Sequence, residues 1–487
     1  MTLEFNKIYN MDCLEGMRQL DTGSIDAIIS DPPYQLTSIT KRFGKEGSAE
    51  AQYGTDGAFQ RVSKGFMGKE WDVLPTVEIL KEALRVLKPG AFALWLMTPR
   101  QDSQLEFLLR LREAGFIISF SPIYWVYASG FPKALNISKA VDKKLGYERE
   151  VTGIDQKFGR ADSGIYQMNI DGENKKIFER YDNPVSPEAK ALNGSYGGFQ
   201  PKPAVEVIIV SMKPLSEDSY VDQALKNRKG ITWLDDCRIP HGESIKYTKR
   251  KEDSMWTKYA LESGGNAGYK SPSVYASPDP DGRFPANLLV SDNAIDIGIN
   301  KKSSLVDGSK MPSTSIYGHK ILPTIRGYDD SGDLSHYFSL DAWWEQKLKE
   351  LPKELQKIFP FLYVPKANRD ERDEGLESVP NGIHGHGNLG NSAGFERFQT
   401  IAKNIHPTVK PIKLMSYLIT LTTREGDVVL DPFIGSGTTA ISALLLGRKF
   451  IGFERETEYY RIANARLSAF AKRKYVRQVS LDKVFEI

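Results

Sequence analysis

The feature of the sequence that most restricts its fold is an alternation of short apolar runs with helically spaced segments at both ends of the chain. Continuously apolar runs predict buried strands, and apolar residues three and four positions apart predict helices. In the N-terminal third, strands and helices are predicted in turn at 24–30, 76–90, 91–98, 104–115 and 116–127. Such alternation is typical of a parallel sheet with helices on its faces.

The same alternation returns near the C-terminal end. Helix, strand, helix, strand and helix are predicted in turn at 411–426, 427–433, 438–447, 449–455 and 458–473. These segments form one βαβ unit, and the N-terminal segments are expected to supply the other half of its sheet.

Between the two halves the pattern is lost. From about residue 139 the sequence is polar and glycine-rich, with one convincing strand at 204–212 and no sustained period from 214 to 355. We therefore expect an irregular insertion and not a second α/β domain. The predicted organisation is an N-terminal half at 1–215 with a mobile loop at 35–71 and an inserted loop at 146–200, an insertion at 216–358, and a C-terminal half at 359–487.

Composition excludes several classes of protein. The 487 residues, 40% of them hydrophobic, suffice for a sizeable core and more than one unit. With 65 Lys and Arg against 62 Asp and Glu, any surface for nucleic acid must be local. Two cysteines are too few for a disulfide framework or a zinc site. The start of the chain has no signal-peptide pattern and no apolar run could span a bilayer, so we expect a cytoplasmic protein.

A glycine turn follows the strand predicted at 427–433. Gly435 and Gly437 allow a ligand to approach the backbone, and the helix N-terminus that follows favours an anionic group. The glycines are not followed by the lysine that a P-loop requires, and no third glycine completes a dinucleotide fingerprint. Glu454 lies 19 positions after Gly435, near the spacing at which an acid reaches ribose hydroxyls. The turn therefore predicts a cofactor with a ribose, and an ordinary tight turn is the alternative.

The segment Asp31-Pro32-Pro33-Tyr34 follows the first predicted strand. Its two prolines lack N–H donors, so their carbonyl oxygens have no local partner. Asp31 adds a carboxylate and Tyr34 a flat ring. Two acceptors and a stacking surface at the end of a strand suit an exocyclic amine on a flat heterocycle; a stiff turn is the alternative.

These motifs resemble those of the DNA amino-methyltransferases that use S-adenosylmethionine. Residues 31–34 are similar to their catalytic motif, 431–439 to their cofactor motif, and 406–411 to the segment that precedes it. A catalytic motif that comes first and a cofactor motif that comes last are typical of the β group, whose sheet is circularly permuted. The resemblance extends over about residues 5–35, 85–145, 200–215 and 360–470 and is closest to phage and prophage members.

The resemblance implies a circularly permuted, Rossmann-like α/β fold with a mostly parallel sheet, helices on both faces and an inserted target-recognition region. The catalytic residues that it implies are Asp31, Pro32, Pro33 and Tyr34. The acceptor base would be flipped out of the duplex to reach them.

For the cofactor, S-adenosylmethionine, the resemblance implies a second group of residues. They are Asp12, Cys13, Thr408, Lys410, Asp431, Pro432, Phe433, Gly435, Ser436, Gly437, Thr438 and Glu454. Within this group Asp12 would bind the adenine and Glu454 the ribose, and the backbone of the glycine turn would bind the methionine portion. Thr408 and Lys410 precede a helix predicted to begin at Pro411, which places them to meet the methionine carboxylate.

The implied substrate is double-stranded DNA. An aspartate before Pro-Pro-Tyr favours adenine N6 as the acceptor, whereas serine is commoner in enzymes that act on cytosine N4. The insertion at 216–358 has the position of a target-recognition region. DNA contacts are predicted at Lys41 and Arg42 in the mobile loop and at Lys249, Arg250 and Lys251 in the insertion, with solvated surface charges as the alternative.

Other functions remain open at the level of sequence. They are a cytosine-N4 methyltransferase, a non-catalytic DNA-binding protein that keeps the methyltransferase fold, and action on RNA; a nicotinamide oxidoreductase is disfavoured by the lone Gly-x-Gly. No metal is expected, because His384 and His386 lie in a glycine-rich loop without nearby cysteines. A companion restriction endonuclease or a second copy of the chain would be the further partners.

Overall fold

The protein is described by a computed structural model. The structure describes residues 3–35, 72–127, 135–149, 183–197, 204–240, 282–291, 338–350, 372–373, 376, 404, 406 and 408–471, together with the backbone of short strands at 153–154, 179–180, 301–303, 306–307, 325–326, 330–332, 382–385 and 399–402.

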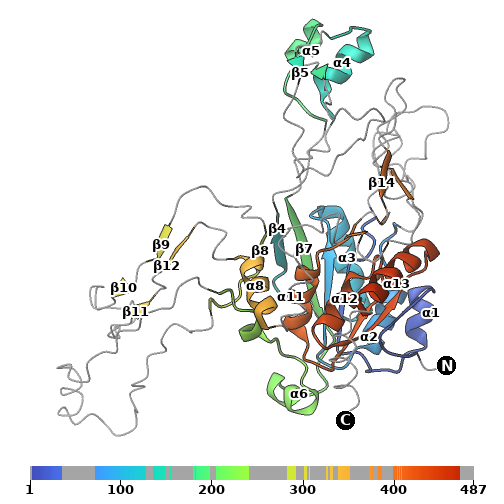
Figure 1. Cartoon of the computed structure of the whole chain (residues 1–487), viewed down its shortest axis with the longest axis vertical. Helices are drawn as coiled ribbons and strands as arrows, with labels where there is room; N and C mark the ends of the chain where they lie inside the picture. Colours follow the sequence, from blue (N-terminus) through green and yellow to red (C-terminus); the bar gives the residue numbers. More distant parts are fainter. Residues whose placement is uncertain are drawn as a thin grey trace.

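An eight-stranded sheet lies at the centre of the described structure (Figure 1), in the order β1-β16-β15-β2-β3-β7-β4-β8. The strands are β1 (Lys7–Tyr9), β2 (Ala27–Ser30), β3 (Phe92–Met97), β4 (Ile123–Val126), β7 (Val205–Met212), β8 (Leu288–Val290), β15 (Val428–Asp431) and β16 (Lys449–Phe453). Only β7 runs antiparallel to its two neighbours, β3 and β4, in this sheet. The predicted mostly parallel, circularly permuted Rossmann-like sheet is therefore confirmed.

The two ends of the chain interleave in this sheet. β1 pairs in parallel with β16, and β15 lies between β16 and β2. Leu430 of β15 is in register with Ile28 of β2. As predicted, the C-terminal βαβ unit and the N-terminal segments form one sheet.

Helices cover both faces of the sheet. One face packs on α1 (Cys13–Arg18), α2 (Val77–Val86) and α3 (Gln101–Ala114). The other packs on α8 (Leu340–Glu350), α11 (Ile412–Thr422), α12 (Thr438–Leu445) and α13 (Thr457–Ala471). The alternation of side chains along each strand explains the division, since Ile28 belongs to the first core and Ile29 to the second.

Helix α11 is buried at every one of its 11 residues. Its sequence is apolar on nearly all sides, which is typical of a helix enclosed by other elements and not of a surface helix. It contacts α12, α8 and β2, and Trp343 of α8 packs edge-on against Tyr417 at 4.9 Å between ring centroids. The helix therefore holds the C-terminal half of the sheet domain to the strands of the N-terminal half.

The predicted insertion at 216–358 differs from the structure at both of its ends. β8 pairs with β4 at the edge of the main sheet, and α8 belongs to the core under α11. The short 3-10 helix η4 (Leu234–Cys237) packs on α11, and Trp343 Nε1 donates to the carbonyl of Asp236 at 2.9 Å. Helix α6 (Tyr220–Asn227) lies beside the turn after α2, where Asn227 Nδ2 donates to the carbonyl of Pro89. Both ends of this region are thus part of the sheet domain.

A small helical pair that the sequence did not predict lies between β4 and β7 in chain order. It consists of α4 (Ile137–Leu145) and α5 (Pro187–Ala191), drawn apart from the sheet in Figure 1. The buried carboxylate of Asp142 ties the two together: it accepts from the backbone N–H and hydroxyl of Ser186 and pairs with Arg149 at 2.7 Å. A polar residue at the centre of this contact explains why no apolar periodicity marked the helix.

Candidate active site

A cavity of about 500 Å³ opens at the carboxyl ends of β2 and β15. Its lining contains the whole Asp31–Tyr34 tip on one side and residues 431–436 of the glycine turn on the other. Because β2 and β15 are adjacent parallel strands, the segments that leave them emerge at the same edge of the sheet. The expectation that the two motifs wall a single cavity is confirmed.

Asp431 fixes the glycine turn to the neighbouring strand. One carboxylate oxygen accepts from the Ser30 hydroxyl at 2.5 Å and from the Phe433 N–H at 3.1 Å, and the other accepts from the Thr439 hydroxyl at 2.6 Å. Burial raises the pKa of Asp431 to about 6, and these hydrogen bonds act in the opposite direction. Predicted as a cofactor ligand, Asp431 directs its hydrogen bonds to the chain and positions the turn that lines the cavity.

The two glycines of the turn serve different contacts. Gly435 lines the cavity with φ +52°, and a Cβ there would lie 2.6 Å from His406 Nε2. Gly437 has φ +83° at the N-cap of α12, and a Cβ there would lie 3.2 Å from Ala463 of α13. Gly437 was predicted as a cofactor residue, but it is not among the lining residues of this cavity. It supports the turn from the side that faces α13.

Glu454, Asp12 and Cys13 line the cavity from the ends of β16 and β1. Glu454 accepts from the N–H of Gly435 at 3.1 Å and from that of Glu456 at 2.8 Å. Burial raises the pKa of Glu454 to about 7. Asp12 caps α1 by accepting from the N–H of Leu14 at 2.8 Å, and burial raises the pKa of the Cys13 thiol to about 12, which keeps it neutral.

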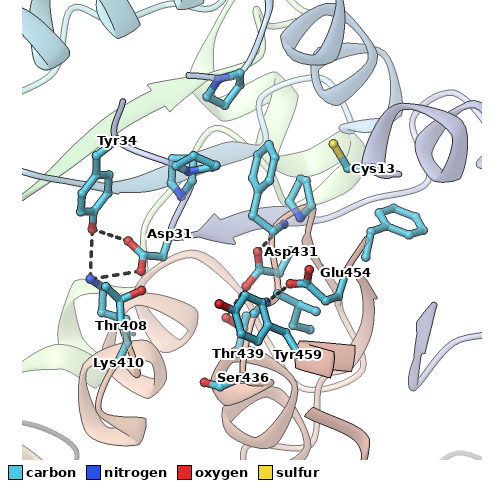
Figure 2. A pocket seen from close by; sticks show the side chains of 18 of the residues that line it. Cys13, Asp31, Tyr34, Thr408, Lys410, Asp431, Ser436, Thr439, Glu454 and Tyr459 are labelled. Atoms are coloured by element: carbon cyan, nitrogen blue, oxygen red, sulfur yellow. Dashed lines mark hydrogen bonds and ion pairs between the residues drawn. The ribbon is translucent and has the colours of Figure 1, made fainter. Parts of the chain in front are cut away.

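Lys410, which was predicted to meet the methionine carboxylate, contacts the Asp31–Tyr34 tip. Its ammonium lies 3.1 Å from Asp31 Oδ2 and donates to the Tyr34 hydroxyl at 3.0 Å (Figure 2). It also lies 2.9 Å from Glu206 Oε2. Lys410 therefore pairs with two carboxylates on the side of the cavity that the Asp31–Tyr34 tip forms. Helix α11 also begins one residue later than predicted, with Pro411 as its N-cap.

The tip itself is held by its own hydrogen bonds. The Tyr34 hydroxyl donates to Asp31 Oδ1, and the Tyr34 N–H donates to Asp72 Oδ1 at 3.0 Å. Burial and the Asp31 charge raise the pKa of Tyr34 well above its ordinary value, so the phenol stays neutral. Burial likewise raises the pKa of Asp31, opposed by the Lys410 charge.

Many of the residues that line the cavity were not identified as site residues from the sequence, and four of them have side chains with polar or aromatic groups that bear on its chemistry. They are Tyr127, Glu206, His406 and Tyr459. The His406 ring packs edge-on against Tyr459 at 4.6 Å, and burial with the nearby cationic Arg372 lowers the pKa of His406 to about 3, so it is neutral. Glu206 carried a usable signal, because it is the one charged residue in the otherwise apolar strand β7.

The cavity is also lined by five further residues that were predicted to bind the cofactor, namely Thr408, Pro432, Phe433, Ser436 and Thr438. Figure 2 shows two groups of side chains, Tyr34, Asp31 and Lys410 in one and Asp431, Glu454 and Tyr459 in the other. We name the two groups after the roles predicted for them: the acceptor corner, with its carboxylate oxygens, and the cofactor corner, formed by the turn, a helix N-terminus and Glu454.

Several predicted positions lie outside the described residues. They are Lys41, Arg42, Lys249, Arg250, Lys251, nearly all of the loop at 35–71 and His386. Within the part of the chain that the structure describes, no group of three or more His, Cys, Asp and Glu side chains could hold a metal ion. None of the described helices is long and apolar enough to cross a membrane.

Comparison with known proteins points to one family. The family model N6_N4_Mtase, described as DNA methylase, matches residues 25–465. The type II methyltransferase M2.DpnII of Streptococcus pneumoniae is 55% identical over 64 residues, 13% of this chain and 24% of that protein. M2.LlaDCHI of Lactococcus lactis subsp. cremoris is 52% identical over 63 residues, 13% of this chain and 23% of that protein. The matched segment thus spans about a quarter of the length of these curated relatives.

Solved structures show a weaker likeness. A PvuII DNA methyltransferase described as cytosine-N4-specific has a TM-score of 0.35 and 13% identity, over 99% of this chain and 94% of that chain. A complex of M1.HpyAVI with SAM has a TM-score of 0.31 and 14% identity, over 95% of this chain and 98% of that chain. Neither TM-score reaches 0.5, so neither likeness bears on the substrate of this chain.

Proposed function

The chain belongs to the DNA methylase family, and on that basis we propose that it is a site-specific DNA methyltransferase that methylates the N6 amine of a flipped-out adenine. The methyl donor is S-adenosylmethionine. The observation that carries the proposal is the single cavity between the Asp31–Tyr34 tip and the glycine turn, because a methyl group must pass directly from donor to amine.

The cofactor corner fits the proposed donor. Gly435 lets the backbone of the turn lie close to His406, since a Cβ there would lie 2.6 Å from His406 Nε2, and the N-terminus of α12 follows the turn. In this proposal Glu454 accepts from the ribose hydroxyls, Asp12 binds the adenine and Thr408 meets the methionine carboxylate, and all three residues line the cavity. S-adenosylmethionine supplies an electrophilic methyl group on a sulfonium.

The acceptor corner orients and activates the amine. The Asp31 carboxylate and the carbonyl oxygen of Pro32 or Pro33 accept the two amine hydrogens, which localises the nitrogen lone pair that the ring otherwise delocalises. S-adenosylmethionine held in the cofactor corner would supply the methyl group to this nitrogen, with the S–C electron pair left on sulfur as the N–C bond forms. The nitrogen then loses one proton to Asp31, which returns it to water.

The residues of the acceptor corner contribute different amounts of free energy to base flipping and to the rate enhancement. Flipping the base costs a few kcal/mol, and stacking on the Tyr34 ring offsets about 1–3 kcal/mol of it. Hydrogen bonds to a charged carboxylate contribute about 1.5–3 kcal/mol each, which is less than a typical enzymatic rate enhancement requires. We therefore assign the larger share to the alignment of nitrogen, methyl and sulfur in the cavity.

Adenine is preferred to cytosine because an aspartate precedes Pro-Pro-Tyr, and cytosine N4 is the second candidate because the same corner can accept hydrogens from either amine. The relatives are described as type II methyltransferases, which supports a place in restriction and modification with a companion endonuclease. The part of the insertion beyond the sheet domain is the proposed target-recognition region.

The experiment is methylation of double-stranded DNA with labelled S-adenosylmethionine, followed by mass spectrometry of the nucleosides. We expect N6-methyladenine. Detection of N4-methylcytosine would show that the acceptor is cytosine, the second candidate. Tight binding of the cofactor without methyl transfer to DNA or RNA would instead identify a non-catalytic protein with a methyltransferase fold.

A further inference from the structure

A buried lysine lies between two carboxylates at the acceptor corner. Lys410 is 8% exposed in its side chain, Asp31 15% and Glu206 16%. The ammonium is 3.1 Å from Asp31 and 2.9 Å from Glu206. A charge at this depth is stabilised only when it is paired, so the three side chains constrain one another's positions.

The three charges come from separate parts of the fold. Asp31 follows β2, Glu206 lies on β7, and Lys410 precedes α11. Strand β3 lies between β2 and β7 in the sheet, so the two carboxylates belong to strands that are not neighbours. Lys410 joins them, and its third contact is the Tyr34 hydroxyl, which donates to Asp31 in turn.

We propose that Lys410 and Glu206 are positioning residues for methyl transfer: Glu206 holds the Lys410 ammonium against Asp31, and the ammonium keeps the Asp31 carboxylate ionised and aimed at the amine. The inference rests on the proposed function and names two residues for the same site. It assigns Lys410 to the acceptor base and not to the methionine carboxylate.

The charge balance of the cluster suits the reaction. Two carboxylates and one ammonium leave one net negative charge facing the cavity. That charge favours the positive charge which passes from sulfur to nitrogen during transfer. Without Glu206 the cluster would be neutral, and without Lys410 it would hold two like charges, one of which would take up a proton.

The groups that face Asp31 determine the sign of each effect. Tyr34 and Lys410 contact it, and Glu206 and Asp431 act on it through their charges. Tyr127, at the end of β4, lies in the field of Glu206 and Lys410. Lys410 lowers the pKa of Asp31 and Glu206 raises it, so removal of each should shift Asp31 in opposite directions.

The test compares the pH dependence of kcat for the wild type with those of Glu206→Gln and Lys410→Met. The acid limb of the profile should move to lower pH in Glu206→Gln and to higher pH in Lys410→Met, each by about 1 unit. The affinity for S-adenosylhomocysteine, measured by calorimetry, should stay within about threefold, since the cofactor corner is untouched. Lys410→Arg keeps the charge and should leave the limb close to its wild-type position.

Lys229→Met is the matched control, because it also removes a buried lysine that bridges two carboxylates, at the opposite end of the sheet. Its pH profile should equal that of the wild type. Acid limbs that stay in place in Glu206→Gln and Lys410→Met would overturn the inference. So would a Lys410→Met variant with unchanged kcat and a loss of affinity for S-adenosylhomocysteine, which would return Lys410 to the methionine carboxylate.

A failure of the proposed function gives a different result. If the wild type methylates neither DNA nor RNA, the proposed function is wrong. The titration of the Asp31 carboxyl carbon, followed by ¹³C NMR in the same variants, still tests the inference. Opposite shifts in the two variants support it, and unchanged titrations overturn it.

Discussion

The amino end and the carboxyl end of the central strands each hold a buried lysine between two carboxylates. At the amino end, Lys229 Nζ lies 2.8 Å from both Asp26 and Asp427, just before β2 and β15 begin. At the carboxyl end, Lys410 bridges Asp31 and a glutamate of β7. Only the second cluster lines the cavity. The same arrangement of charges therefore serves two purposes in one sheet.

The difference lies in how fully each aspartate is hydrogen-bonded. Burial alone would raise the pKa of Asp26, but the Lys229 and Lys88 ammonium groups and the N–H of Val428 hold it below its ordinary value. For Asp31, burial and a second carboxylate outweigh Lys410, and the pKa is raised. A fully satisfied carboxylate stabilises the fold, whereas one that retains acceptor capacity toward a cavity is available to a substrate.

The strongest test of this contrast is the pair Asp31→Ala and Asp26→Ala. Asp31→Ala should lower kcat by about 10³-fold or more while the affinity for S-adenosylhomocysteine is kept, because the amine loses its acceptor. Asp26→Ala should instead lower the thermal midpoint and leave kcat per folded molecule near the wild-type value. Methyl-transfer assays and calorimetry check both. Normal turnover by Asp31→Ala would remove the basis of the assignment.

Removal of the structural lysine should have the next largest effect. Lys229→Met leaves Asp26 and Asp427 facing each other without their shared cation, which should cost about 3–5 kcal/mol in the free energy of unfolding. Urea denaturation at neutral pH measures this loss. A variant as stable as the wild type would show that the amino-end cluster contributes no more than a surface ion pair, and the contrast between the two ends would be lost.

Two glycines, one before and one after β15, extend the comparison to the backbone. Gly435→Ala should weaken binding of S-adenosylhomocysteine by about tenfold or more, because its Cβ would meet His406 at 2.6 Å in a residue with φ +52°. Gly426, before the amino end of β15, has φ +83° and open space around its Cβ position, so Gly426→Ala should cost about 1 kcal/mol of stability and no affinity. Equal affinities of the two variants would contradict a cofactor at Gly435.

The smallest expected effect is a pH dependence of cofactor binding at the carboxyl end. Glu454 has a pKa raised to about 7, so it becomes a full carboxylate acceptor only as the pH rises through neutrality. The Kd for S-adenosylhomocysteine should therefore fall by about three- to tenfold from pH 6 to pH 8. In Glu454→Gln this change should disappear. If the wild type and Glu454→Gln showed the same pH dependence, Glu454 would not be the residue that binds the ribose.

Much of the fold and part of the site follow from local sequence. The longer strands of the sheet are largely apolar, and Asp31–Tyr34 and the glycine turn carry their chemistry in consecutive residues, so both could be identified without distant contacts. The helices on the C-terminal side were likewise marked by apolar spacing. β1 and β8 were not predicted, because three residues are too few to show a period.

The positions of Lys410 and Glu206 depend on tertiary structure. The sequence shows that Lys410 precedes a helix, but its side chain is long enough to reach either corner, and the carboxylates that attract it follow from strand order. Glu206 lies in a strand that was predicted, yet its partner is fixed only when β7 inserts antiparallel between β3 and β4. Helix α4 was missed for a related reason, since its buried face carries Ser138 and Asp142 in place of an apolar stripe.

The strand order also has a consequence for synthesis on the ribosome. The Ser30 hydroxyl of β2 meets its partner, the Asp431 carboxylate, 401 positions later in the chain, and β1 pairs with β16 later still. Until those strands emerge, β2 presents an uncovered edge that a nascent polypeptide must shield from aggregation. The cavity between the Asp31–Tyr34 tip and the glycine turn cannot form before then. A translation product that stops short of β15 would therefore be inactive even if its first half folded.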